Sequence, residues 1–184
     1  MTANADKYRR LVAGFSAVVD AVPADKWSAP APCADWTARD VVAHVVAGTW
    51  QISSVVTGRS PELGDPELGD DPAATWAQAR DLALAALTDE NLAKNVPSPV
   101  GGEISLDQRI GMFSTLEVLI HTWDLAKAAG IDVVLDPEVV RETYDELLPM
   151  DEIIRIPNVF GPKVEPPAGA DLQTTLMCFT GRQP

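Results

Sequence analysis

Apolar side chains recur every three or four residues in several segments of the chain, which is the period of an α-helix. The first of these segments covers residues 5–22, and Pro23 ends it because proline does not continue a helix. Its apolar positions are Tyr8, Leu11, Val12, Phe15, Val18, Val19 and Val22. The sequence therefore opens with a predicted helix of about five turns.

Capping residues mark where further helices begin. Thr37 with Asp40, and Ser105 with Gln108, have the spacing of a capping box, in which two side chains satisfy free N–H groups at a helix start. At residues 71–72 and 136–137 an Asp precedes a Pro, the preferred order of N-cap and first helical residue. The helices predicted from these signals cover about residues 37–57, 71–92, 105–129 and 136–148, and a closing helix covers about residues 172–180.

Four long helical patterns without strand-like alternation predict the all-α class, in the form of a four-helix bundle with one or two extra C-terminal helices. We expect one domain over residues 1–184, with the core bundle at about 5–130 and a C-terminal extension at about 131–184. Residues 59–71, which repeat the letters PELGD, are expected to form a surface loop. The Pro/Gly-rich stretch before the closing helix leaves room for a short extended segment around Val164.

Charge and composition exclude several classes of partner. The chain has 14 Lys and Arg against 27 Asp and Glu, a net charge of −13, which argues against binding to nucleic acid or to an anionic membrane. No apolar run reaches the roughly 20 residues of a membrane span, and the N-terminus lacks the apolar core of a signal peptide. Cys33 and Cys178, far apart in sequence, are expected to be reduced thiols. We therefore expect a cytoplasmic protein.

Both histidines of the chain occur in apolar helical segments. In the stretch TLEVLIHTWDLA, Glu117, His121 and Asp124 fall within about 60° of one another on a helical wheel. His44 lies in the second predicted helix. If the two helices face each other, two imidazoles and one carboxylate supply the three protein ligands of a catalytic zinc site, and the same donors suit Ni²⁺, Fe²⁺ or Mn²⁺. Asp124 is then a group that orients a ligand, or a catalytic acid or base.

Simpler interpretations compete with this one. A Glu and a His four residues apart often form only an ion pair, and spacing alone does not decide whether a metal is bound. Cys33 could be a ligand or a nucleophile, but we favour a simply buried thiol. Arg182 could clamp an anionic substrate, but we favour a terminal charge in solvent. Trp36, directly before the cap residue Thr37, is expected to pack at the helix start.

Three stretches carry a family resemblance: PCADWTARDVVAHVVAG, EVLIHTWDLAKAAG and FTGRQP. They resemble the DinB/YfiT-like superfamily, and more closely the short actinobacterial relatives of the N-terminal, metal-binding domain of mycothiol-dependent maleylpyruvate isomerases. The resemblance implies a divalent metal held by His44, Glu117 and His121. It also implies a low-molecular-weight thiol such as mycothiol, an electrophilic small-molecule substrate, and a bundle that can form a homodimer.

The function that the resemblance implies is a metal-dependent thiol S-transferase or isomerase. The isomerase has a further C-terminal domain for which a chain of 184 residues leaves little room, so maleylpyruvate itself is not the expected substrate. Two alternatives stay open: a non-catalytic, stress-related metal-binding bundle, and a structural or dimerising bundle with a degenerate site. The sequence has no Gly-rich nucleotide loop and no G-x-S-x-G motif, so nucleotide cofactors and serine hydrolysis lack support.

Overall fold

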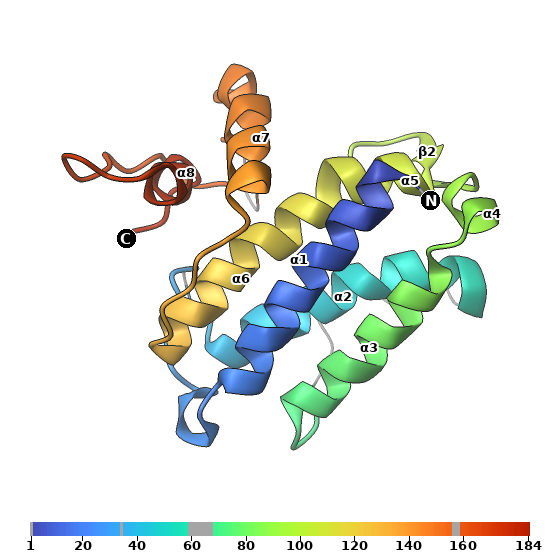
Figure 1. Ribbon diagram of the computed structural model, residues 1–184, viewed down its shortest axis with the longest axis horizontal. Helices are drawn as coiled ribbons and strands as arrows, with labels where there is room; N and C mark the ends of the chain where they lie inside the picture. The colour runs from blue at the N-terminus through green and yellow to red at the C-terminus, as the bar shows by residue number, and fades with distance from the viewer. Residues whose placement is uncertain (1, 34, 59–67, 156–158) are drawn as a thin grey trace.

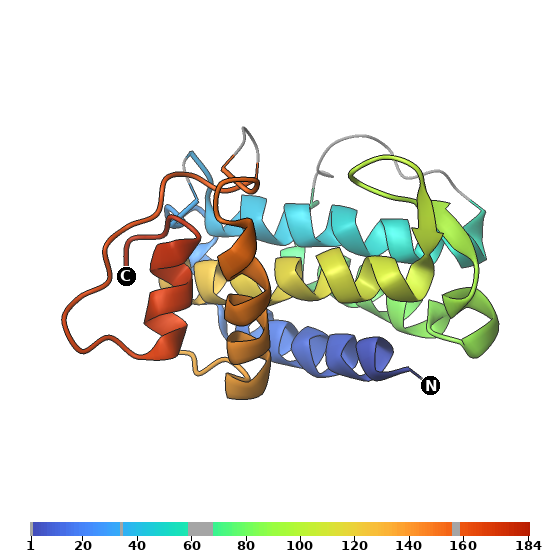
Figure 2. The ribbon, with the colours of Figure 1, turned by 90° about the horizontal axis from the view of Figure 1, so that it is seen from above.

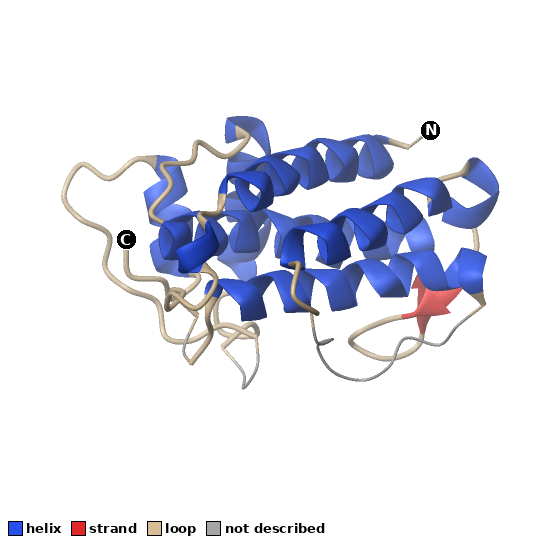
Figure 3. Ribbon diagram, turned by 90° about the horizontal axis from the view of Figure 1, so that it is seen from below, coloured by secondary structure: helices blue, strands red, loops and turns tan. Residues whose placement is uncertain are grey.

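The computed structural model describes residues 2–33, 35–58, 68–155 and 159–184. Most of the predicted PELGD loop lies outside the described residues. Helices account for most of the described chain, and the only sheet within it has two short strands (Figure 3). The predicted all-helical class is therefore confirmed.

Four long helices form the body of the fold: α1 (Ala3–Ala21), α2 (Ala38–Thr57), α3 (Pro72–Ala86) and α6 (Thr115–Ala129). They contact one another in a ring, α1 with α6, α6 with α2, α2 with α3, and α3 with α1 (Figure 1). Apolar side chains from all four helices fill the space between them, and Trp76 of α3 packs edge-on against Phe15 of α1 with ring centroids 4.7 Å apart. Because α2 and α6 are neighbours in this ring, their polar side chains can meet.

The helix starts lie where the capping signals predicted them. The Thr37 hydroxyl accepts from the backbone N–H of Asp40, and the Asp40 carboxylate accepts from the backbone N–H of Thr37 at 2.7 Å. Ser105 and Gln108 make the same reciprocal pair. The last residue of α2 is followed by Gly58, whose φ of +65° is left-handed and suits glycine. Local side-chain chemistry thus fixes the start of α2, which carries His44, and the start of the helical segment that leads into α6.

The chain between α3 and α6 differs from the prediction. The third helix ends at Ala86 instead of Leu92, because Thr88 caps a separate short helix, α4 (Asp89–Leu92). A β-hairpin follows, in which β1 (Asn95–Pro97) pairs antiparallel with β2 (Glu103–Ser105). Gly101 and Gly102 have positive φ in its turn. Strands of three residues are too short to show an alternating pattern, so spacing could not predict them.

The helix predicted from Ser105 to Gly130 has a defect in its first half. It begins as α5 (Leu106–Arg109), widens into the π-helical turn η2 (Ile110–Ser114) and continues as α6. Gly111 lies in this turn, and a Cβ there would stand 2.6 Å from the Asn4 side chain of α1. The close approach of α1 therefore requires a glycine. Single π-turns often lie near functional sites, and this one ends three residues before Glu117.

The C-terminal part contains α7 (Pro137–Leu147), the turn η3 (Leu148–Met150) and α8 (Leu172–Phe179), and the turn η1 (Ala24–Lys26) precedes α2. In Figures 1 and 2, α7 and α8 lie at one end of the long helices and the hairpin lies at the other. No strand forms around Val164, whose N–H donates to the carbonyl of the buried Cys178. Among the described helices, none has both the length and the apolar character needed to cross a membrane.

Candidate functional site

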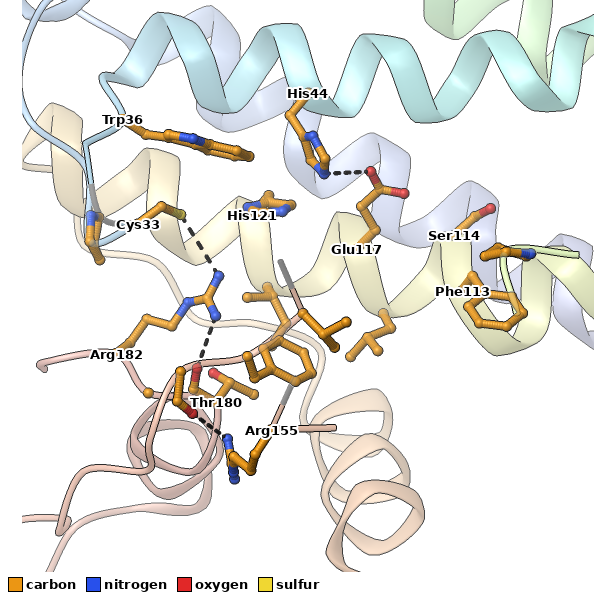
Figure 4. Close-up of a pocket in the computed structure, with 18 of the residues that line it drawn as sticks. Cys33, Trp36, His44, Phe113, Ser114, Glu117, His121, Arg155, Thr180 and Arg182 are labelled. Carbon is orange, nitrogen blue, oxygen red and sulfur yellow. Dashed lines mark hydrogen bonds and ion pairs between the residues drawn. The ribbon is translucent and has the colours of Figure 1, made fainter. Parts of the chain in front are cut away.

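A cavity of about 1200 Å³ runs along α6, from the C-terminal part of the chain to the tip of the hairpin. Trp36, His44, Glu117 and His121 line it from the bundle side, as Figure 4 shows. Its opposite wall comes from residues 159–162 and 180–182. The cavity therefore joins the two predicted histidine helices to two segments that follow α6 by thirty residues or more.

His44 and Glu117 meet across the interface of α2 and α6. The Nε2 atom of His44 lies 3.2 Å from Oε1 of Glu117, with 36% and 23% of the two side chains exposed. Gly48, one helical turn after His44, makes room for this carboxylate. A Cβ at Gly48 would stand 2.7 Å from Oε2 of Glu117. The contact thus depends on a small residue at the point where the two helices approach.

The His121 ring lies next to the His44 ring. Their centroids are 5.1 Å apart and the rings meet edge-on. Trp36 packs against both, with its centroid 4.8 Å from that of His44 and 5.7 Å from that of His121 (Figure 4). Trp36 was predicted to pack at the start of its helix. The structure gives it a second role that spacing could not reveal, because it restricts both imidazole rings.

Asp124 is completely buried behind His121. Its carboxylate accepts a forked pair of hydrogen bonds from Arg182, at 2.9 Å from Nη2 and 3.2 Å from Nε, and its Oδ2 lies 3.0 Å from Nδ1 of His121. Burial alone would raise the pKa of Asp124, but the hydrogen bonds and charges of His121 and Arg182 outweigh burial and lower it to about 2. The ionised carboxylate can only accept, so Nδ1 of His121 carries a proton in this contact.

Arg182 and Cys33 complete the surroundings of Asp124. The prediction of a solvent-exposed Arg182 is wrong, since only 11% of its side chain is exposed and it is paired with Asp124. Cys33 is half-buried and lines the cavity, and its S–H donates to Oδ2 of Asp124 at 3.0 Å. Burial, followed by the charge of Asp124, raises the pKa of the Cys33 thiol to about 12. Cys33 is thus a neutral hydrogen-bond donor at the site, which the prediction of a simply buried thiol missed.

Comparison with known proteins confirms the resemblance found in the sequence. The model of the family described as "Mycothiol maleylpyruvate isomerase N-terminal domain" matches residues 8–126. The chain belongs to this family. Two uncharacterized proteins from two strains of Mycobacterium tuberculosis are each 33% identical to it over 138 residues, which make up 73% of this chain and 72% of each relative.

A solved structure shares the fold of this family member. The crystal structure of the mycothiol-dependent maleylpyruvate isomerase has a TM-score of 0.54 to it, covering 78% of this chain and 68% of that chain at 14% identity. The family match ends at residue 126, so it includes His44, Glu117, His121 and Asp124 and leaves out Arg182. The wall formed by residues 159–162 and 180–182 lies outside the matched region as well.

Two sets of donors near His121 are candidates for a metal ion, and among the described residues only one of them has three donor atoms already close together. In one set, atoms of Cys33, His121 and Asp124 lie within 4.8 Å of one another. There Arg182 already neutralises Asp124 and the thiol is protonated, so a cation has little to gain. In the other set, the 3.2 Å between the His44 and Glu117 donors matches the roughly 3.3 Å expected between two donors on one tetrahedral ion with bonds of about 2 Å. The donor chemistry of His44, Glu117 and His121 therefore fits a divalent metal. Among the described residues, however, these three are not a group whose donor atoms all lie within 4.8 Å of one another, so the site stays a prediction.

Proposed function

We propose that this protein is a metal-dependent enzyme that uses a low-molecular-weight thiol, such as mycothiol, to transfer the thiol to an electrophilic small molecule or to isomerise it. The observation that carries the proposal is the approach of His44 and Glu117 to 3.2 Å, with the His121 ring beside them on the wall of a large cavity. Membership of the mycothiol isomerase N-terminal domain family supports the same activity.

His44, Glu117 and His121 would hold the metal, with zinc the first candidate and nickel, iron or manganese the others. A bound divalent cation lowers the pKa of a coordinated thiol and so supplies a thiolate at neutral pH. Trp36 covers both imidazoles and limits their motion. The cavity, at about 1200 Å³, exceeds the roughly 300–1,000 Å³ of a typical small-ligand site, which suits a thiol and a second substrate bound together.

Asp124 was predicted either to orient a ligand or to transfer protons. Its complete burial and its lowered pKa favour the first role, because an ionised carboxylate shared between Arg182 and His121 is a weak base. In the proposed enzyme it keeps Nδ1 of His121 protonated and the ring in one orientation, so that Nε2 is available as a ligand. Asp124 is therefore a positioning residue.

The first test is metal content. Wild-type protein purified without chelators should contain close to one divalent ion per chain, and the His44→Ala variant should contain almost none. A matched Cys33→Ser variant should keep its metal. A wild-type protein that binds no divalent ion would refute the proposal and favour a structural or dimerising bundle with a degenerate site.

The second test is turnover. Metal-loaded protein is assayed for conjugation of a chromogenic aryl halide with mycothiol, bacillithiol, glutathione and cysteine in turn. We expect a rate above the uncatalysed one with at least one thiol, and its loss in His44→Ala. Stoichiometric metal without activity toward any of the four thiols would contradict the transferase assignment and favour the non-catalytic metal-binding alternative.

A further inference from the structure

Arg109 lines the same cavity at the end nearest the hairpin. It is the last residue of α5, and only 9% of the residue is exposed. Its Nη1 donates to the carbonyl of Pro97 in β1 at 2.8 Å, and its Nη2 donates to the side-chain oxygen of Gln51 on α2. Both acceptors are neutral, so the positive charge itself is not compensated by either contact.

The other two arginines of the cavity have carboxylate partners. Arg155 pairs with Asp151 at 2.8 Å, and Arg182 pairs with Asp124 at 2.9 Å. For Arg109, no carboxylate of the described residues lies within ion-pair distance, and Glu117 acts on it only as a more distant charge. Burying a guanidinium without a counter-ion is unfavourable, and a bound anion would offset that cost. The chain has a net charge of −13, so a buried arginine without a paired carboxylate is unusual in it.

Gln51 adds a second set of donors beside Arg109. Because its side-chain oxygen accepts from Arg109, its amide nitrogen keeps two N–H groups, and no acceptor among the described residues takes them. Gln51 lies seven residues after His44, so the two positions are about 10 Å apart along α2. Ser114 and Phe113, which lie between Arg109 and Glu117 in sequence, also line the cavity, and Figure 4 shows them next to Glu117.

We propose that Arg109 and Gln51 form a carboxylate-binding subsite, which holds the anionic end of the substrate about 10 Å from the His44–Glu117 pair. A guanidinium and an amide present parallel N–H groups that match the two oxygens of a carboxylate. One positive charge near Glu117 suits a monoanion better than a phosphate dianion. The inference rests on the proposed function, from which the reaction is taken. The subsite adds the substrate class, which is an electrophile that carries a carboxylate.

Binding of small probes tests the subsite without any turnover. Butyrate, its neutral analogue butyramide and inorganic phosphate are titrated into full-length, isotope-labelled protein in the presence of a chelator, and the Arg side-chain NMR signals are followed. We expect butyrate to shift the Arg109 signal and to bind at least about tenfold more tightly than butyramide, as charge-assisted hydrogen bonds imply. Because the protein is metal-free, this result does not depend on whether it binds metal or thiol.

Variants then separate the subsite from a general charge effect. Arg109→Gln should weaken butyrate binding about tenfold or more and leave butyramide binding unchanged. The control Arg141→Gln changes the net charge equally on the exposed side of α7 and should change neither. Gln51→Glu gives Arg109 an internal counter-ion, so it should raise the melting temperature and abolish the preference for butyrate.

Three results would overturn the proposal. These are equal binding of butyrate and butyramide by the wild type, unchanged butyrate binding in Arg109→Gln, and phosphate binding tighter than butyrate binding. Should Arg109→Gln fail to fold, the Gln51→Glu variant still decides, because retained butyrate preference there contradicts the subsite. Loss of the subsite with intact metal binding would leave the proposed function standing.

Discussion

Two polar clusters meet at His121, and they differ in how their charges are balanced. The ligand cluster consists of His44, Glu117 and His121, and its side chains face the cavity. The anchor cluster consists of Cys33, Asp124 and Arg182. In the anchor cluster, a carboxylate with no exposed surface is paired with a guanidinium of which 11% is exposed. In the ligand cluster, an imidazole and a carboxylate meet at 3.2 Å with 36% and 23% of their side chains exposed.

This difference indicates that the anchor cluster stabilises the fold, whereas the ligand cluster is suited to bind an ion. The anchor cluster satisfies its own charges, and through Arg182 it ties the C-terminal wall of the cavity to α6. The ligand cluster places an imidazole nitrogen and a carboxylate oxygen 3.2 Å apart on an accessible surface, where a cation could bind both. We therefore expect substitutions in the anchor cluster to change stability most, and substitutions in the ligand cluster to change metal binding most.

The largest effect on stability is expected for Asp124→Ala. The substitution leaves the guanidinium of Arg182 buried without its partner, and breaking a buried pair costs about 3–5 kcal/mol. Urea unfolding of the metal-free protein measures the loss. Glu90→Ala, which removes an exposed partner of Lys94, should cost less than about 1 kcal/mol. Equal costs for the two variants would contradict the anchoring role.

The next effect concerns stabilisation by metal. Zinc at a hundredfold excess over its dissociation constant should raise the free energy of unfolding of the wild type by about 2.7 kcal/mol. Glu117→Gln, in the ligand cluster, should lose most of this gain because it removes a ligand. Cys33→Ser, in the anchor cluster, should keep it. The reverse result would move the metal to the anchor cluster.

A third effect appears at low pH. The folded-state pKa of Asp124 is lowered to about 2, so its contribution to stability is complete above the unfolded value near 4 and is lost as the pH falls from about 4 to 2. The loss over this range should be about 2 kcal/mol larger in the wild type than in Asp124→Asn. Urea unfolding at stepped pH in the presence of a chelator measures it. Parallel profiles would contradict the pairing with Arg182.

The smallest effect on stability is expected at Gly48. In Gly48→Ala the new Cβ meets the end of the flexible Glu117 side chain, so the free energy of unfolding should change by less than about 1 kcal/mol. Metal affinity should nevertheless fall by about 10- to 100-fold, because a ligand is displaced. Gly14→Ala on α1 is the matched control. A Cβ there meets nothing within 4 Å, so it should stabilise the helix by about 0.5–1 kcal/mol and leave metal affinity unchanged.

The sequence predicted those features of the fold that depend on neighbouring residues. Thr37 with Asp40 and Ser105 with Gln108 cap their helices as expected, since a capping box needs only side chains three residues apart. The hairpin and the separate helix α4 escaped prediction, because elements of three or four residues show no period. The π-helical turn also escaped, because the apolar spacing of the sequence does not distinguish it from a continuous α-helix.

The site was predictable where the helical period applied and unpredictable where distant segments meet. Glu117 and His121 share a face of one helix, and the position of His44 on a facing helix followed from the family pattern. The pairing of Arg182 with Asp124 joins residues 58 apart in sequence, and Arg182 approaches Cys33 across 149 residues. No local pattern encodes such contacts. Arg182, two residues before the last residue, was therefore assigned to solvent, although it lines the cavity.

Anomalous diffraction from crystals of the metal-loaded protein, recorded on both sides of the absorption edge of the metal, tests the central claim most directly. The account predicts one peak bound by His44, Glu117 and His121 at about 2.0–2.2 Å from each donor atom. A peak between Cys33 and Asp124, or no peak in protein that was loaded to one ion per chain, would contradict it.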